Sequence, residues 1–135
     1  MFIDNNRLSG VIPPEWCSLT SLVELHLSGN QLTGTIPECL GSQLTKITSL
    51  LLNDNQLNGT IPGSLGSLTS LQMLVLGGNK FTGSLPSALG TAGGLRSLTL
   101  LNVSFNMLTG PIPTSLGSLS SLSLLNVSHN YFNGS

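Results

Sequence analysis

Residues that could do chemistry are few in this chain of 135 residues, and they lie far apart. The two histidines are His26 and His129. The carboxylates are scattered along the first half, at Asp4, Glu15, Glu24, Glu38 and Asp54. Catalysis needs a nucleophile beside a base, a cluster of metal ligands or a phosphate-binding loop, and this spacing indicates none of them. We therefore predict no catalytic residue, no metal and no cofactor.

Four asparagines stand in Asn-x-Ser/Thr tripeptides, which are acceptor sites for N-linked glycans in secreted proteins. They are Asn58, Asn102, Asn126 and Asn133. A chain this rich in Asn, Ser and Thr would contain roughly three such tripeptides by chance. Their positions favour an outward orientation, so we expect a glycan on at least one of them if the protein enters a secretory pathway.

A single repeated pattern must position all of these residues. It reads L-x-x-L-x-L-x-x-N-x-L-x-G-x-I-P and is clearest at residues 22–37, returning at 47–62, 71–86 and 98–113. Shortened copies occupy residues 3–13 and 122–135. The pattern asparagines, which lie 24 to 27 residues apart, are Asn6, Asn30, Asn55, Asn79, Asn106 and Asn130. A constant period of this length indicates a solenoid of stacked coils.

Elementary physics explains the pattern. Alternation in Leu25-His26-Leu27 puts both leucines on one face and His26 on the other. One such strand cannot bury its apolar face alone, whereas stacked coils form a parallel sheet over a shared core. We expect strands centred on Ile3 and on residues 25–27, 50–52, 74–76, 101–103 and 125–127. Each pattern asparagine can bond backbone groups that the turn leaves unpaired, which predicts a ladder of asparagines.

This register resembles the leucine-rich repeat family in its extracellular plant type, which includes receptor-like protein ectodomains and polygalacturonase-inhibitor-like proteins. The resemblance covers nearly the whole chain. It implies an α/β solenoid, right-handed, with a parallel concave β-sheet and short 3-10 or irregular convex segments. We expect a single solenoid over residues 1–135, with about four complete repeats between truncated first and last repeats, as a fragment of a longer array.

Two coils depart from the regular length. Gln43 is a single inserted residue, which should bulge on the convex side. Three extra residues precede the fourth repeat, where Ala92 is interpreted as replacing the usual leucine. We align Leu101 and Val103 with the strand leucines of the earlier coils, because the competing register would require asparagine at position 103.

The two cysteines, Cys17 and Cys39, fall in adjacent coils. Cys17 aligns with Gly41, two positions beyond Cys39, and this offset is near the outer limit of disulfide reach. A bridge between the two and a pair of free, partly buried thiols are both compatible with the sequence.

The resemblance also implies that ligands bind the concave face, at the solvent-facing positions between the strand leucines. The candidate ligand-binding residues are Phe2, Asp4, His26, Ser28, Leu51, Asn53, Asp54, Val75, Asn102, Ser104, Phe105, Asn126, Ser128 and His129. These side chains mix polar, aromatic and apolar groups with little charge. That mixture suits hydrogen bonding and stacking with a protein, peptide or glycan ligand. The sequence therefore predicts an extracellular or cell-surface recognition module.

Two other functions remain open. The chain could instead be a structural segment of a glycosylated surface coat or extracellular filament, associating end to end. Apolar residues of both end coils, such as Ile3 and Leu125, would then be covered by a neighbouring molecule. Rows of hydroxyls such as those of Thr33 and Thr82 are compatible with ice binding, although a neighbouring row breaks at Pro111.

Composition excludes further classes. Charged residues make up 7% of the chain and the net charge is −1. Without a basic patch, nucleic-acid binding is not expected. No apolar run reaches about 18 residues, so no membrane span is predicted in this segment. The first four residues lack the charged start and apolar run of a signal peptide.

Overall fold

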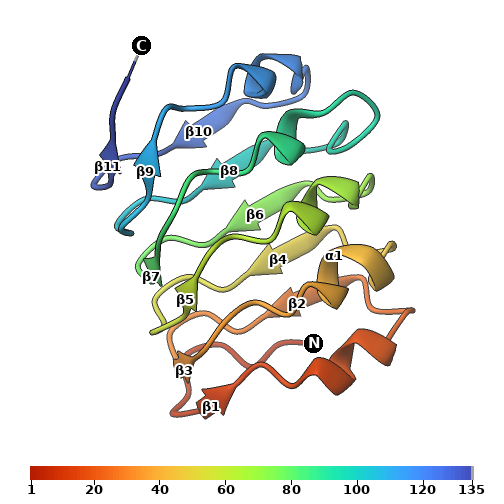
Figure 1. Ribbon diagram of the computed structural model, residues 1–135. Helices are drawn as coiled ribbons and strands as arrows, with labels where there is room; N and C mark the ends of the chain where they lie inside the picture. The colour runs from red at the N-terminus through yellow and green to blue at the C-terminus, as the bar shows by residue number, and fades with distance from the viewer. Residues whose placement is uncertain (135) are drawn as a thin grey trace.

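Extended segments and tight turns alternate along the chain because pairs of strand-forming leucines are separated by Asn, Gly and Pro. The computed structural model describes residues 1–134 as a stack of coils, each lying beside the next (Figure 1). A coil contains a concave strand, a second short extended segment and, in all but the last, a helical turn on the convex side. The fold is thus the predicted solenoid.

The concave side is a five-stranded parallel sheet of order β10-β8-β6-β4-β2. Its strands are β2 (Glu24–His26), β4 (Ser49–Leu51), β6 (Met73–Val75), β8 (Leu100–Asn102) and β10 (Leu124–Asn126). The predicted parallel sheet is confirmed, but each strand begins and ends one residue earlier than expected. The strand expected at Ile3 is reduced to a single bridge between Phe2 and His26.

Shorter elements complete each coil. The outer strands are β1 (Ser9–Val11), β3 (Gln31–Thr33), β5 (Asn58–Gly59), β7 (Lys80–Phe81), β9 (Thr109–Gly110) and β11 (Tyr131–Phe132), paired in parallel as β1-β3, β5-β7 and β9-β11. The convex helices are η1 (Pro14–Ser18), α1 (Cys39–Gln43), η2 (Gly63–Ser67), η3 (Ser87–Gly90) and η4 (Thr114–Ser118). An extended proline immediately precedes each 3-10 helix, a position where its missing N–H leaves no helical hydrogen bond unmade. The predicted 3-10 convex segments are confirmed.

The inserted Gln43 changes the type of helix on the convex side. In a regular coil the Leu68 N–H donates to the Leu65 carbonyl, three residues back, whereas the Leu44 N–H donates to the Leu40 carbonyl, four residues back. An α-turn holds more residues than a 3-10 turn, so it takes up the extra residue. The concave pairing of Leu25 with Leu50 is therefore undisturbed.

The longer insertion, which precedes Leu98, shows that the interpretation of Ala92 was wrong. Leu101 pairs with Leu74 as aligned, but Ala92 is exposed and does not replace a core leucine. Leu95 is buried instead, and its carbonyl accepts the Leu98 N–H as the Leu68 carbonyl accepts the Leu71 N–H. The extra residues lie ahead of Leu95, so the leucine is displaced in sequence but not in space.

The core is a narrow column of apolar side chains along the stack. At one repeat position the buried residues are Leu25, Leu50, Leu74 and Leu101, each exposed by 1% or less. At another position Phe81 is fully buried where four of the other coils have leucine and the last coil has Phe132. Each coil thus buries its apolar face only against its neighbours, as the repeat pattern requires.

Five of the six pattern asparagines form the expected ladder, and Asn6 is the exception, since it is exposed and bonds only within its own turn. The Asn55 amide donates to the carbonyls of Leu27, Leu52 and Asn53 at 2.9, 3.2 and 3.3 Å, and its Oδ1 accepts the Leu32 N–H at 3.0 Å. Asn30, Asn79, Asn106 and Asn130 repeat these contacts. Each of these asparagines thereby joins its own coil to the coil before it.

Replacing Asn55 by alanine is expected to lower the free energy of unfolding by about 1–3 kcal/mol, because buried backbone groups lose their partners. Thermal or urea unfolding would measure the change. Asn6→Ala is the matched control, since Asn6 is exposed and bonds only the carbonyls of Ile3 and Asp4 in its own turn. Equal losses in the two variants would contradict the ladder as a source of stability.

A column of glycines lets the convex turns approach closely. Gly41, Gly66 and Gly90 hold the same position in successive coils. A Cβ at Gly66 would lie 2.7 Å from the carbonyl carbon of Ala88, and one at Gly90 would lie 2.6 Å from the backbone nitrogen of Leu116. These separations are too short for a real contact, so a side chain there would force two coils apart. Gly117 holds this position in η4, the last convex helix, and nothing within residues 1–134 approaches its Cβ position within 4 Å.

Candidate functional site

The parallel register assembles the predicted concave residues into rows that run along the stack (Figure 1). The central row is Phe2, His26, Leu51, Val75, Asn102 and Asn126. The next residues of each coil give two further rows, with Asp4, Ser28, Asn53, Ser104 and Ser128 in one and Asp54, Phe105 and His129 in the other. Because the alternating residues such as Leu25 and Leu50 are buried, these rows face away from the core.

In the first half of this face, His26 is the centre of a polar cluster. Its Nε2 lies 2.8 Å from Ser49 Oγ and 3.7 Å from a Glu24 carboxylate oxygen, and its Nδ1 lies 3.9 Å from an Asp4 carboxylate oxygen. Phe2 packs edge-on against the imidazole, with ring centroids 4.6 Å apart. Two carboxylates on one imidazole make this cluster attractive to a cationic group of a ligand.

Ser49 and His26 form a hydroxyl–imidazole contact that the sequence did not indicate. The two residues are 23 positions apart in sequence and meet only because their strands pair. Ser49 is 3% exposed, so a substrate cannot reach its hydroxyl. The neighbouring backbone N–H groups are engaged in the sheet and cannot stabilise an oxyanion. The hydroxyl therefore orients the imidazole and does not act as a nucleophile.

A chain of hydrogen bonds links three coils across the second row. Asp4 Oδ1 accepts the Ser28 N–H at 2.8 Å, the Ser28 hydroxyl donates to Asn53 Oδ1 at 2.6 Å, and the Asn53 amide donates to Asp54 Oδ2 at 2.7 Å. Such a network fixes side chains before a ligand arrives. Within residues 1–134 the other carboxylate oxygen, Asp54 Oδ1, accepts no hydrogen bond and remains free to accept one from a ligand.

Charge is distributed unevenly along the concave face. Its three carboxylates, Asp4, Glu24 and Asp54, all lie in the first half, and among the described residues these rows contain no Lys or Arg. From residue 97 onward the sequence has no acidic or basic side chain other than His129 and Tyr131. The face is therefore acidic in its first half and close to neutral in its second half.

In the second half, two asparagines lie side by side in paired strands. Asn102 Oδ1 accepts the Ser104 N–H and hydroxyl at 3.0 and 2.7 Å, and Asn126 Oδ1 accepts the same groups of Ser128 at 3.1 and 2.8 Å. Within residues 1–134 neither Nδ2 has a partner, so both amides can donate to a ligand. Ser104 was predicted to face solvent, but it is buried, because its hydroxyl turns back to Asn102.

Phe105 and His129 stack on each other where a side chain is disfavoured. Both have left-handed φ angles of 52°, and this position holds Gly29 or Gly78 in other coils, which tolerate that conformation. A left-handed conformation costs a bulky residue about 1–2 kcal/mol, and a stacked pair returns only about 0.5–1.5 kcal/mol. Phe105 is also 58% exposed, so burial offsets little of this cost.

One further row of concave residues was missed from the sequence. It contains Glu24, Ser49, Met73, Leu100 and Leu124, and the strand register pairs each with its neighbour. The alternation that places His26 outside also places Glu24 outside, two residues earlier. The sequence did contain a signal for this row. Extending the alternation by one residue toward the N-terminus from the first buried leucine of each strand, from Leu25 to Glu24 for example, would have identified it.

The four sequon asparagines occupy two kinds of position. Asn58 lies in β5 and is exposed, as is Asn133 just after β11, whereas Asn102 and Asn126 are half-buried in the sheet. The Ser135 that completes the sequon of Asn133 lies outside the described residues. Glycan attachment at these four asparagines remains a proposal.

Cys17 and Cys39 form a disulfide, with Cα atoms 5.8 Å apart. The sequence left open whether the two thiols were bridged or free. Cys17 holds the coil position that is glycine in the next coils. Between the first and second coils, the convex helices η1 and α1 are thus joined by a covalent bond. Between later coils, the same position is a close glycine contact.

Two hydroxyls of the flank are engaged with the backbone. Thr33 Oγ1 donates to the Gly10 carbonyl at 3.2 Å, and Thr82 Oγ1 donates to the Gly59 carbonyl at 3.4 Å. These hydroxyls contribute to coil stacking, which leaves them less available to order water.

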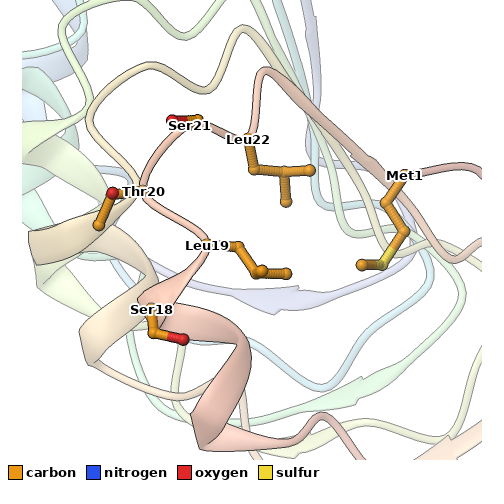
Figure 2. Close-up of a pocket in the computed structure, with 6 residues that line it drawn as sticks. All are labelled: Met1, Ser18, Leu19, Thr20, Ser21 and Leu22. Carbon is orange, nitrogen blue, oxygen red and sulfur yellow. The ribbon is translucent and has the colours of Figure 1, made fainter.

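A depression of the surface lies at the N-terminal end of the stack and has a volume of about 590 Å³. Figure 2 shows the side chains of Met1, Leu19 and Leu22 pointing into the same space, with Ser18, Thr20 and Ser21 around it. The residues at the corresponding positions one coil later, Leu25, Leu44 and Ile47, are fully buried. The depression is thus the open end of the apolar core and lies away from the concave rows.

Within residues 1–134, no helix has the length and apolar character needed to cross a membrane. The same residues contain no group of three or more His, Cys, Asp or Glu side chains suited to a metal ion.

Comparison with protein families gives a direct match. The family model described as Leucine Rich Repeat matches residues 1–19, 21–43, 46–68, 70–92 and 97–119. Receptor-like protein 32 of Arabidopsis thaliana is 44% identical over 46 residues, which are 34% of this chain and 5% of that protein. The chain thus spans a small part of this relative.

Solved structures are similar over almost the whole chain. The ectodomain of the plant membrane receptor kinase GASSHO1/SCHENGEN3 from Arabidopsis thaliana, in complex with CASPARIAN STRIP INTEGRITY FACTOR 2, matches with a TM-score of 0.94 and 44% identity, covering 98% of this chain and 16% of that chain. The Arabidopsis receptor kinase HAESA, in complex with the peptide hormone IDA and the co-receptor SERK1, matches with a TM-score of 0.91 and 34% identity, covering 97% of this chain and 21% of that chain.

Proposed function

This chain belongs to the leucine-rich repeat family, and we propose that it is a ligand-recognition segment of a receptor-type protein that binds a peptide through its concave face. Its similarity to the ectodomains of plant cell-surface receptors makes it an extracellular or cell-surface, non-catalytic binding module. A disulfide is also typical of that oxidising environment. Two of its solved relatives are bound to a partner named as an integrity factor or as a peptide hormone.

The observation that carries the proposal is the cluster around His26. Asp4 and Glu24 present two carboxylates beside an exposed aromatic ring, Phe2, and no cation of the concave rows neutralises them. A peptide with a Lys or Arg next to an apolar side chain would place charge on the carboxylates and the apolar group on the ring. Because the network from Asp4 to Asp54 is already bonded, little side-chain ordering is needed on binding.

Peptide preference tests the proposal. Synthetic decapeptides of matched hydropathy, one set basic and one acidic, would be titrated against the protein, and the basic set is expected to bind more tightly, with weaker binding at higher salt. The double variant Asp4→Asn/Glu24→Gln should weaken binding of the basic set by roughly tenfold, the order expected for two partly exposed charges.

The matched control is Glu15→Gln/Glu38→Gln, which changes the net charge equally but lies on the convex side. It should leave binding of the basic peptides unchanged. Equal affinity for acidic and basic peptides, or an equal loss in the control, would reject the concave cluster as the recognition site.

A second candidate function is stacking against further coils, supplied by flanking repeats of a longer array or by another copy. The open core at Met1, Leu19 and Leu22 and the unoccupied space at Gly117 favour it. Sedimentation velocity over a range of concentrations would detect association of copies, and a constant monomer would exclude that form of it. The comparisons lend no support to a filament, because the relatives are receptor ectodomains.

A further inference from the structure

We propose that the concave face carries a separate subsite for one neutral sugar unit of an external oligosaccharide, stacked on Phe105 above Gly77 and Gly78. The proposal deepens the proposed function and rests on the concave face being a recognition surface. It concerns the part of that face between Asp54 and His129, whereas the peptide proposal concerns the carboxylates of Asp4 and Glu24 around His26.

The ring of Phe105 has one open face. His129, in the following coil, covers the other face, with ring centroids 4.1 Å apart and planes inclined by 14°. The open face is directed toward the preceding coil, where β6 runs beside β8 (Figure 1). The residue at the same position of that coil is Gly78, which has no side chain to cover the ring. A flat apolar group can therefore lie against Phe105.

Polar groups surround this open position. Asp54 Oδ1, which accepts no hydrogen bond within residues 1–134, is the atom closest to where a Cβ of Gly78 would be. A Cβ of Gly77 would lie 3.2 Å from Ser104 Oγ and 3.3 Å from Asn102 Oδ1. The free Nδ2 of Asn102 adds a donor. An aromatic face with a carboxylate acceptor and an amide donor beside it matches a sugar ring, whose C–H face is apolar and whose edge carries hydroxyls.

The charge pattern selects a neutral sugar. From residue 97 onward the chain has no Asp, Glu, Lys or Arg, and the concave rows contain no Lys or Arg among the described residues. An acidic sugar would meet Asp54 without any compensating cation, which disfavours uronic acids. An acidic peptide would likewise meet no cation here.

The cost of the Phe105 conformation indicates that the ring is retained for binding. In the same row, Asn5 and Asp54 have left-handed φ angles of 54° and 55°, and these residue types adopt that conformation readily. Phe105 is both disfavoured there and exposed. Strain of this kind persists at binding sites more than elsewhere.

Titration with neutral tetrasaccharides tests the proposal, with cellotetraose, xylotetraose, mannotetraose and tetra-N-acetylchitotetraose as probes and tetragalacturonic acid as the acidic contrast. Binding to the full chain would be followed by NMR or calorimetry. At least one neutral probe should bind, and more tightly than the acidic one. Phe105→Asn should weaken that binding by roughly tenfold, the loss expected for one stacked contact with its buried area.

Phe105→Asn also separates binding from folding, because asparagine suits the left-handed conformation and should leave thermal stability equal or higher. Tyr131→Asn is the matched control, since Tyr131 is an equally exposed aromatic ring, 68% exposed, that lies outside the subsite. It should change sugar affinity by less than about twofold. Equal losses in the two variants, no binding of any neutral probe, or tighter binding of tetragalacturonic acid would each overturn the subsite.

The choice of expression host distinguishes an external oligosaccharide from a glycan attached to the protein itself. The full chain would be produced in the bacterial periplasm, which allows the disulfide but adds no N-glycan, and in a secreting eukaryotic host. Binding to both products supports an external ligand. Binding to the periplasmic product alone would overturn that assignment, because a glycan on Asn102 or Asn126 would then fill the site. If no sugar binds, the result expected for basic peptides and the Asp4→Asn/Glu24→Gln variant does not change. The two proposals can therefore be rejected independently.

Discussion

Replacing Gly90 by alanine is expected to destabilise the protein by about 3 kcal/mol, at the upper end of the range for overpacking a close contact. The new methyl group would overlap the backbone around Ser115 and Leu116. Backbone atoms of a neighbouring coil cannot turn aside as the end of a flexible side chain can, so η3 and η4 would have to separate. Urea unfolding monitored by circular dichroism would measure the loss.

Gly117→Ala is the matched control for this prediction. Gly117 occupies the same position of the next coil, yet nothing in the described chain approaches its Cβ position. Alanine there should be neutral or slightly stabilising, since alanine favours helical conformation more than glycine does. If the two variants unfolded at the same urea concentration, close coil contact could not explain the glycine column.

Removing the disulfide by Cys17→Ser/Cys39→Ser is expected to lower the free energy of unfolding by about 3 kcal/mol, the chain-entropy value for a closed loop of this size. The bonded residues are 22 positions apart. The first coil has only one neighbour, so without the bond η1 should separate from α1 before the rest of the stack unfolds. Thermal unfolding and hydrogen exchange of residues 9–19 would measure both effects.

A reducing agent provides the control. It should lower the melting temperature of the wild-type protein to that of the double variant and leave the variant unchanged. A wild-type melting temperature that does not respond to reduction would show that the bridge contributes nothing to stability.

The repeat pattern was sufficient to predict the buried strand leucines and the ladder asparagines that follow Asn6. Leu101 and Asn106 were placed correctly because the period of two and the spacing to the asparagine are local constraints with one solution. The three central concave rows followed from the same alternation. This part of the structure is repetitive, so one coil interpreted correctly determines the others.

Other features depended on contacts between coils, which a single repeat does not encode. The pairing of His26 with Ser49 requires the register of two strands, and the burial of Ser104 requires its bond to Asn102. Leu95 took the place assigned to Ala92 because a loop of extra residues can fold outward at no expense to the core. The stack of Phe105 on His129 arises only when neighbouring coils align.

Both departures from regular length, at Gln43 and ahead of Leu95, fall on the convex side, while the concave pairings continue unbroken. Each interior coil makes the same ladder bonds to its neighbours. A gene encoding such a chain can therefore gain or lose one whole coil by recombination and still specify a closed core. Such an event would slide the acidic and aromatic halves of the concave face relative to each other by one strand spacing. Gain or loss of a coil would in this way change the distance between the acidic cluster and the aromatic pair without changing any residue that stabilises the fold.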